Sequence, residues 1–548
     1  MGDLSGRKPS AGACFLSIVA AFSLVFSLAG DALARDPENY PPRRAAAQKK
    51  AALRSVQRAA VANQPRAWAG RRNLASARPS SERSPSEHST SAHSGANAPR
   101  LTAAVPPGRS GAPSHALMQE RAQRMLAHRA DILAQRSRLP QHPFPGERGF
   151  TGVPPAGETR FVSNEMVFHV GSNVSRQAVD DVARKLGLTT VGSHNVALTG
   201  GTMFRFRVAD GRSVPDAVRA LEAEKIGVAQ PNYVFKLQQD PKLAARTKGG
   251  ELGQYVVNKL HLGEVHRVAT GSNVLVAVID SEIDSRHPDL AGALVERFDA
   301  VGHLDRPHSH GTGMTGAIVA HRQLMGIAPA ARILAIHAFS PDAAESPQAT
   351  TQHILAGLEW AISKGARVIN MSFAGPYDPM LQLAMKKAHD KGVVLIAAAG
   401  NMGPTSPPLY PAADANVIAV TAVDQNDKLF ASANQGPHIA VAAPGVDILE
   451  PAPNDAYQIT TGTSVAAAHV SGIAALMIER NSTLKPETIH EILTSTAKPL
   501  GPKGRNDEFG WGLVDPTKAL LEVDAQVADD ARNPAKPAAL RPGPISSR

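Results

Sequence analysis

Short apolar runs alternate with helix-like segments between residues 274 and 423, and this alternation constrains the fold of the chain most. The run Val274 to Ile279 contains only aliphatic residues, which is typical of a strand buried on both faces. Similar runs predict strands at 333–339, 368–371, 393–399 and 417–423, with helices at 350–363 and 380–390. Strands joined by helices form mostly parallel sheets with helices on both faces. The sequence therefore predicts an α/β fold of this kind.

Three polar residues lie at the ends of such elements. Asp280 ends the first strand-like run, His310 opens a Gly-rich helix-like segment, and Ser464 begins an Ala-rich run that continues to about Glu479. Taken singly, each has a structural explanation: an ion pair, a hydrogen-bonded core imidazole or a helix cap. Taken together they favour nucleophilic catalysis, because a serine hydroxyl needs a nearby base and that base needs an orienting group.

In this chain order, and in their Gly/Ser/Thr-rich contexts, these residues resemble the triad of the subtilisin-like serine proteases (subtilases, peptidase family S8). The resemblance extends from about Gln254 to Val523, and the segments 368–375, 397–401 and 510–515 support it. It implies hydrolysis of polypeptide substrates through an acyl-enzyme. Ser464 would be the nucleophile, His310 the general base and Asp280 the group that orients the imidazole.

The resemblance also implies groups that bind the substrate. Asn401, which would otherwise be interpreted as a turn residue after Gly400, would donate its amide to the oxyanion together with the backbone N–H of Ser464. A strand that pairs with an extended substrate backbone is implied at Ser372, Phe373, Ala374 and Gly375.

The chain departs from the family pattern at several positions. Glu282 stands where the family usually has Gly after Asp-Ser, and it would be strained there if the backbone needed a positive φ. Gly313 replaces the second His of the family's His-Gly-Thr-His. The segment between residues 320 and 326 is shorter than in family members that bind calcium there. The calcium site is therefore not carried over, although Asp289 matches one of its ligands.

No metal or other cofactor is predicted. His303, His308 and His310 lie near one another in the sequence, but no carboxylate or Cys pattern completes a metal site around them.

Residues 159–238 precede the catalytic segment and show the element order β-α-β-β-α-β of a small ferredoxin-like α+β domain. This region resembles the inhibitory propeptides of subtilisin-like proteases, which makes the prodomain an expected intramolecular inhibitor. An additional binding domain is the alternative. Residues 239–251 are polar and Gly-bearing, as an exposed, cleavable linker requires. The peptidase domain is expected at 252–523 and a disordered tail at 524–548.

The N-terminal residues carry signals for export. Residues 1–34 have the charged start, apolar run and Ala-x-Ala site of a secretory signal peptide. The single Cys, Cys14, would be lost with it, and no later segment is long and apolar enough to span a membrane. Residues 113–158 are expected to hold an amphipathic helix and a linker, with an apolar face of Met118, Met125, Leu126, Ile132 and Leu133.

Residues 35–112 are rich in Ala, Arg, Ser and Pro, and a segment of this composition is expected to be disordered. A passive linker and a basic arm that binds an acidic surface partner are both open.

Two functions follow from these features. The first is a secreted or periplasmic serine endopeptidase made as a zymogen. The second is an inactive exported homologue that acts as a binding scaffold, and the possible strain at Glu282 is its main support.

Overall fold

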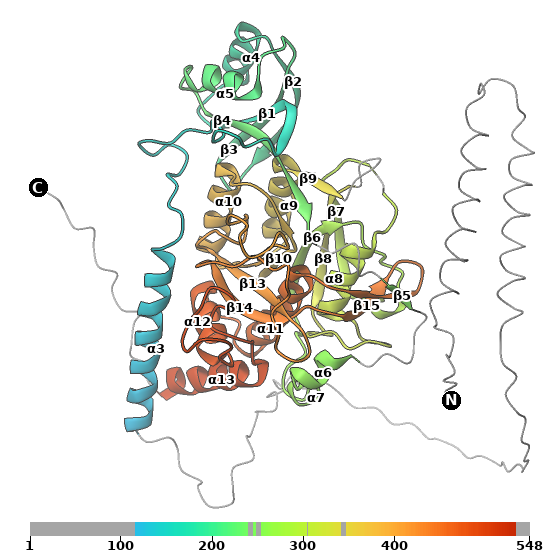
Figure 1. Cartoon of the computed structure of the whole chain (residues 1–548). Coiled ribbons are helices and arrows are strands. Elements are labelled where there is room, and N and C mark those ends of the chain that lie inside the picture. The colour runs from blue at the N-terminus through green and yellow to red at the C-terminus, as the bar shows by residue number, and fades with distance from the viewer. Residues whose placement is uncertain (1–114, 239–244, 248–253, 304, 341–346, 533–548) are drawn as a thin grey trace, which may run out of the picture. The chain divides into compact units, whose positions relative to one another are not determined.

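The computed structural model describes residues 115–238, 245–247, 254–303, 305–340 and 347–532 (Figure 1). The predicted signal peptide (1–34) and basic segment (35–112) lie outside these residues. None of the described helices is long and apolar enough to cross a membrane.

A seven-stranded sheet forms the centre of residues 254–532, which are called the sheet domain below. Its strand order is β14-β13-β12-β10-β6-β8-β7, and every neighbouring pair is parallel. The strands are β6 (Leu275–Ser281), β7 (Leu294–Asp299), β8 (Arg332–Phe339), β10 (Val368–Met371), β12 (Val394–Ala398), β13 (Val417–Val423) and β14 (Ile439–Pro444). The predicted parallel α/β fold is confirmed.

Helices cover both faces of this sheet, as the side chains of the central strand β6 show. Val276 and Val278 belong to the core that contains α8 (Ser309–Val319) and α11 (Thr463–Arg480). Ala277 and Ile279 belong to the opposite core, which contains α9 (Thr351–Ser363) and α10 (Pro379–Asp390). Successive side chains of a strand point to opposite faces, so the uninterrupted apolar run of β6 reflects burial on both.

The remaining elements of the sheet domain lie around this frame. They include the helices α6 (Tyr255–Lys259), α7 (Leu262–Val265), α12 (Pro486–Thr496) and α13 (Pro516–Arg532), the short helix η1 (Pro288–Leu290), and the strands β15 (Ile448–Ala452) and β16 (Ala456–Thr460). The last two form a small sheet with β5 (Ala245–Thr247), which precedes the sheet domain in the chain. Strand β5 lies inside the expected linker 239–251. Helix α13 continues past residue 524, where a tail was expected, because Asp524 is held by Arg480 at 3.0 Å.

Residues 159–238 form a separate α+β unit, called the small domain below. Its elements are β1 (Phe161–Gly171), α4 (Arg176–Lys185), β2 (Leu188–Val196), β3 (Gly201–Val208), α5 (Val214–Glu222) and β4 (Val228–Leu237). The sheet order β4-β1-β3-β2 is that of the predicted ferredoxin-like fold. Ser175 and Ser213 cap the two helices, each accepting a backbone N–H at 3.2 Å.

Strand β4 links the two domains. Beyond the small-domain sheet it pairs antiparallel with β11 (Phe373–Ala374) on one side and β9 (Gln348–Thr350) on the other. Gln230 on the same strand bonds Asp378, the N-cap residue of α10, at 2.7 Å.

Helix α3 (His115–Arg136) precedes the small domain and packs against the sheet domain near α12 and α13 (Figure 1). Ile132 is buried, but Leu126 and Leu133 are 67% and 58% exposed. The predicted apolar face is therefore only partly correct, because arginine and histidine side chains make many of the contacts of α3 with the sheet domain.

Candidate active site

Asp280 and His310 meet at the carboxyl edge of the parallel sheet. Strand β6 lies between β8 and β10, so the chain connections on its two sides run in opposite directions along the sheet. The carboxyl end of such a strand is where open α/β sheets bind their ligands. Nδ1 of His310, on the first turn of α8, lies 2.8 Å and 2.9 Å from the two carboxylate oxygens of Asp280. Both side chains are fully buried, so the carboxylate fixes the orientation of the imidazole.

The close approach of α8 to β6 depends on small neighbouring groups. A Cβ atom at Gly311 would collide with the backbone oxygen of Ser281, so glycine is required there. The hydroxyl of Ser281 donates to Asp280 at 3.0 Å and accepts the Gly311 N–H at 3.1 Å. Nδ1 of His308, the N-cap residue, accepts the His310 N–H at 3.2 Å, and burial lowers the pKa of His308. These contacts hold the start of α8 in place.

Ser464 is the second residue of α11, and Gly462 is the N-cap residue of this helix. Its hydroxyl donates to the backbone carbonyl of Gln238 and also lies 3.2 Å from the carbonyl of Ser372. No hydrogen bond joins it to His310, whose Nε2 is buried and has no hydrogen-bond partner among the described residues. The structure therefore joins the carboxylate to the imidazole, while the hydroxyl is engaged by a segment of the same chain.

That segment is the end of β4, an extended strand that lies between β11 and β9; the space between these two strands is called the cleft below. Leu237 and Lys236 pair with Phe373 and Ala374. One residue further, the N–H of Gln238 donates to the carbonyl of Ser372 at 3.3 Å. The segment predicted from the resemblance to pair with an extended backbone thus pairs with the chain's own strand.

Asn401 lies near the backbone carbonyl of Gln238. Its Oδ1 accepts the backbone N–H and the hydroxyl of Thr463 at 3.1 Å and 2.8 Å. Its buried Nδ2 has no hydrogen-bond partner among the described residues. A Cβ atom at Gly462 would lie 2.7 Å from the Gln238 oxygen and 3.0 Å from this Nδ2. Thr463 thus fixes the amide so that its N–H groups are available near the carbonyl.

Glu282 is not strained. It is absent from the described non-glycine residues with positive φ, and its carboxylate pairs with Nε of Arg297 at 2.9 Å. The condition for backbone strain, a positive φ at this position, is therefore not met, because the chain takes an ordinary conformation there.

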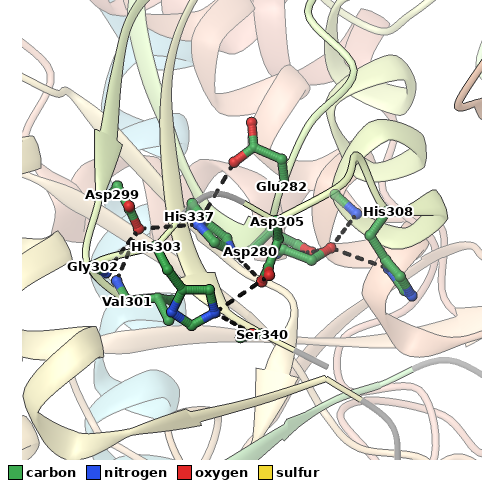
Figure 2. A network of polar contacts seen from close by, with 12 residues as sticks. Asp280, Glu282, Asp299, Val301, Gly302, His303, Asp305, His308, His337 and Ser340 are labelled. Carbon is green, nitrogen blue, oxygen red and sulfur yellow. Dashed lines mark hydrogen bonds and ion pairs between the residues drawn. The ribbon is translucent and has the colours of Figure 1, made fainter. Parts of the chain in front are cut away.

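Glu282 belongs to a polar network beside Asp280, shown in Figure 2. His337, on β8, has one ring nitrogen 3.1 Å from Asp299 and the other 3.0 Å from Asp305. His303 lies 3.3 Å from Asp305. The network ties the ends of β7 and β8 to the segment that leads into α8.

Gly313 faces a buried carboxyl group. A Cβ atom there would lie 2.5 Å from Oε2 of Glu450, on β15. Glu450 is fully buried, and neither carboxyl oxygen has a partner in good hydrogen-bond geometry among the described residues, although the Thr460 hydroxyl is close enough to oppose the rise in the pKa of Glu450. Burial, together with the charge of Asp280, raises the pKa of Glu450 to about 8. The missing side chain at Gly313 therefore provides the space for this carboxyl group.

Asp289 does not fit a calcium ligand in this structure. One carboxylate oxygen accepts the backbone N–H groups of Arg322, Gln323 and Leu324 at 2.8–3.0 Å, and the other accepts the hydroxyl of Tyr457 at 2.6 Å. Although burial opposes it, these hydrogen bonds lower the pKa of Asp289. The short 320–326 segment thus provides N–H donors to the carboxylate, in the place where a calcium ligand would need a free oxygen.

The three histidines considered for a metal do not converge. His310 bonds Asp280, whereas His303 bonds Ser340 at 3.1 Å in the neighbouring network. Among the described residues, no group of three or more His, Cys, Asp or Glu side chains is arranged to hold a metal ion.

Sequence reasoning missed the roles of Gln238, Ser281 and Glu450. Ser281 follows Asp280 directly, so a contact was foreseeable from a strand end. Gln238 and Glu450 gave no signal, because their roles depend on strand register and on a partner distant in the chain.

Comparisons with known proteins agree with this geometry. The subtilase family model matches residues 271–512. A thermophilic serine proteinase from Bacillus sp. (strain AK1) is 30% identical over 361 residues, covering 64% of this chain and 86% of that protein. Subtilisin E from Bacillus subtilis (strain 168) is 39% identical over 298 residues, covering 51% of this chain and 76% of that protein.

A solved structure is similar as well. The crystal structure of fervidolysin from Fervidobacterium pennivorans, a keratinolytic enzyme related to subtilisin, matches with a TM-score of 0.56 at 26% identity. The match covers 70% of this chain and 64% of that one, slightly less than two thirds of its length.

Proposed function

The chain belongs to the subtilase family of serine endopeptidases, and from this membership we propose that it cleaves polypeptides with Asp280, His310 and Ser464 and is exported as a zymogen. The observation that carries the proposal is the chain's own Gln238, whose backbone occupies the cleft beside Ser464.

In the proposed reaction, Nε2 of His310 takes the proton of the Ser464 hydroxyl while Oγ bonds to the substrate carbonyl carbon. The oxygen that becomes negative accepts hydrogen bonds from Asn401 Nδ2 and the Ser464 N–H. The imidazolium, oriented by Asp280, then protonates the leaving nitrogen as the peptide C–N bond breaks. Water hydrolyses the acyl-enzyme by the same proton path, which restores the hydroxyl.

The occupied cleft supports self-processing. Antiparallel pairing with β11 presents the peptide as a substrate strand would be presented, and the carbonyl next to Ser464 belongs to Gln238. The bond cut would therefore join Gln238 to Gln239, at the start of the predicted linker. The small domain would then block the cleft until it leaves, which fits the prodomain predicted from the resemblance.

The inactive scaffold has lost its main support. It depended on a strained Glu282, and Glu282 has an ordinary backbone.

A covalent probe and an intact mass test the proposal together. Wild type should yield a fragment that ends at Gln238, and once that fragment has been released a fluorophosphonate should label wild type but not Ser464→Ala. Ser471→Ala is the matched control: it lies on the same helix, and its hydroxyl bonds Asn370 and Ala467. Equal full-length masses for wild type and Ser464→Ala would refute self-processing, and equal labelling would refute the nucleophile.

A further inference from the structure

Helix α3 contacts the sheet domain on the face that carries α12 and α13, whereas β4 enters the cleft between β11 and β9. Both belong to the part of the chain that precedes Gln238. We propose that α3 is a second anchor, which keeps this N-terminal part bound after the Gln238–Gln239 bond is cut and makes it a bivalent inhibitor. The inference rests on the proposed function, because it concerns how that same site is released.

The first set of anchor contacts is ionic. The guanidinium of Arg121 binds the carboxylate of Glu522 at 2.7 Å and that of Asp529 at 2.6 Å, both on α13. The side chains of Arg121 and Glu522 are each only 18% exposed. Arg129 adds an ion pair with Glu491 on α12 at 3.1 Å. A paired guanidinium that is mostly removed from solvent gives both strength and orientation.

The second set surrounds the indole of Trp511. The ring of His128 packs on it with centroids 4.3 Å apart, and Nε2 of His128 bonds the Thr494 hydroxyl at 2.8 Å. Gln135 is buried, accepts the indole N–H at 3.3 Å and donates to the carbonyl of Pro437 at 2.9 Å. The indole N–H of Trp511 and the carbonyl of Pro437 thus find their partner on α3, whereas the Thr494 hydroxyl also donates to the His490 carbonyl within α12 at 2.7 Å.

The chain between α3 and the small domain is held as well. The ring of His142 stacks on Tyr377 at 3.8 Å and bonds the hydroxyl of Tyr410 at 3.2 Å. At the other end, the N–H of Gly152 donates to Glu222 of α5 at 2.6 Å. The connection, residues 137–160, is therefore tied to the sheet domain at one end and to the small domain at the other. If one anchor detaches while the other stays bound, the detached anchor remains at high effective concentration near its site.

Cleavage after Gln238 breaks none of these contacts. For two linked sites, the overall affinity exceeds that of either site by about 10²–10⁴-fold when the linker spans them well. The N-terminal part should therefore remain bound until α3 detaches or the connection is itself cut.

The test uses the full chain with Ser464→Ala, so that it does not depend on self-processing. A recognition sequence for an unrelated site-specific protease is placed between Asp240 and Pro241 and cut in trans. The C-terminal end is immobilised, and release of the N-terminal fragment is followed over time. Arg121→Glu reverses the charge that faces Glu522 and Asp529, and we expect release to accelerate by at least about tenfold.

Arg124→Glu is the matched control, since Arg124 is exposed on the same helix and makes no ion pair with the described residues. It should change the release rate by less than about twofold. Arg121→Glu combined with Glu522→Arg should recover part of the retention. Circular dichroism before cutting shows that each variant is folded.

Equal release rates for Arg121→Glu and Arg124→Glu would overturn the second anchor. Release of the unsubstituted fragment as fast as that of Arg121→Glu would do the same. If the anchor behaves as expected but the active chain never cuts itself, only the proposed processing fails.

Discussion

Replacement of Glu450 by glutamine should remove a pH-dependent loss of stability. In the folded protein the buried carboxyl group has a pKa of about 8, against 4.5 for an ordinary glutamate. Between these two values the folded chain keeps a proton that the unfolded chain releases. The contribution of Glu450 to the free energy of unfolding is therefore fully present below about pH 4.5, decreases as the pH rises, and is lost above about pH 8.

The size of the effect follows from the same two values. Each tenfold difference in proton affinity corresponds to about 1.4 kcal/mol, so the wild type should lose up to about 5 kcal/mol relative to Glu450→Gln over this range. Burial is the main cause, and the negative charge of Asp280 adds to it. The side chains of Gln458 and Thr460, on the neighbouring strand β16, are uncharged at every pH and therefore add no pH dependence of their own.

The assay is guanidinium unfolding, followed by tryptophan fluorescence at several pH values between about 4.5 and about 9. Both chains carry Ser464→Ala so that they cannot digest themselves. Glu508→Gln, at an exposed position, is the control and should differ from wild type by a small constant amount. A constant difference between wild type and Glu450→Gln across the whole range would refute the reasoning, because it would mean that the carboxyl group is not held neutral.

Four further outcomes are expected. Asn401→Ala should lower kcat by about 10²–10³-fold with KM nearly unchanged, which is the loss seen when a subtilisin loses such a donor; an unchanged kcat in steady-state assays would exclude Asn401 as the oxyanion donor. Phe235→Ala removes a fully buried ring that packs edge-on against Phe373 and should speed release in the assay above by about 10²-fold or more; unaltered release would mean that this ring does not hold β4. Gly313→Ala should destabilise the chain by about 1–3 kcal/mol through its contact with Glu450, and Glu450→Ser should restore the lost stability in a double-mutant cycle. Lack of rescue would mean that the added methyl group does not act through Glu450. Chelation with EDTA should leave the melting temperature within about 2 °C, whereas Asp289→Asn should cost about 2 kcal/mol or more; a large EDTA effect would contradict the hydrogen-bonded role of Asp289.

Much of the sheet domain was predictable because its signals are local and strong. The run Val417–Val423 is a strand at the predicted bounds, since all seven of its residues are buried and six of them are aliphatic. Asp280 and His310 were likewise predictable, because each stands at the end of an element that the sequence marks clearly.

What the sequence could not supply is register and the choice of face. A shift of β4 by one residue would bring a different carbonyl to Ser464, and the sequence of the strand does not fix that register. The face of α3 was misjudged for a related reason: Arg121 and His128 look like solvent-facing residues until Glu522 and Trp511 are placed beside them. Gly313 and Glu450 are informative only as a pair, and the pair exists only in the folded chain.

The position of the bond proposed for cleavage bears on what limits activation. The N–H of Gln238, the pairing of Leu237 and the burial of Phe235 all lie on the N-terminal side of that bond. Cutting it therefore leaves every contact that holds the peptide in the cleft, and the new carboxylate stays beside Ser464 as a product. Release of the N-terminal fragment requires both β4 and α3 to dissociate from the sheet domain, so it should be slower than cleavage. An active chain should therefore accumulate as a cut but inhibited complex before activity appears.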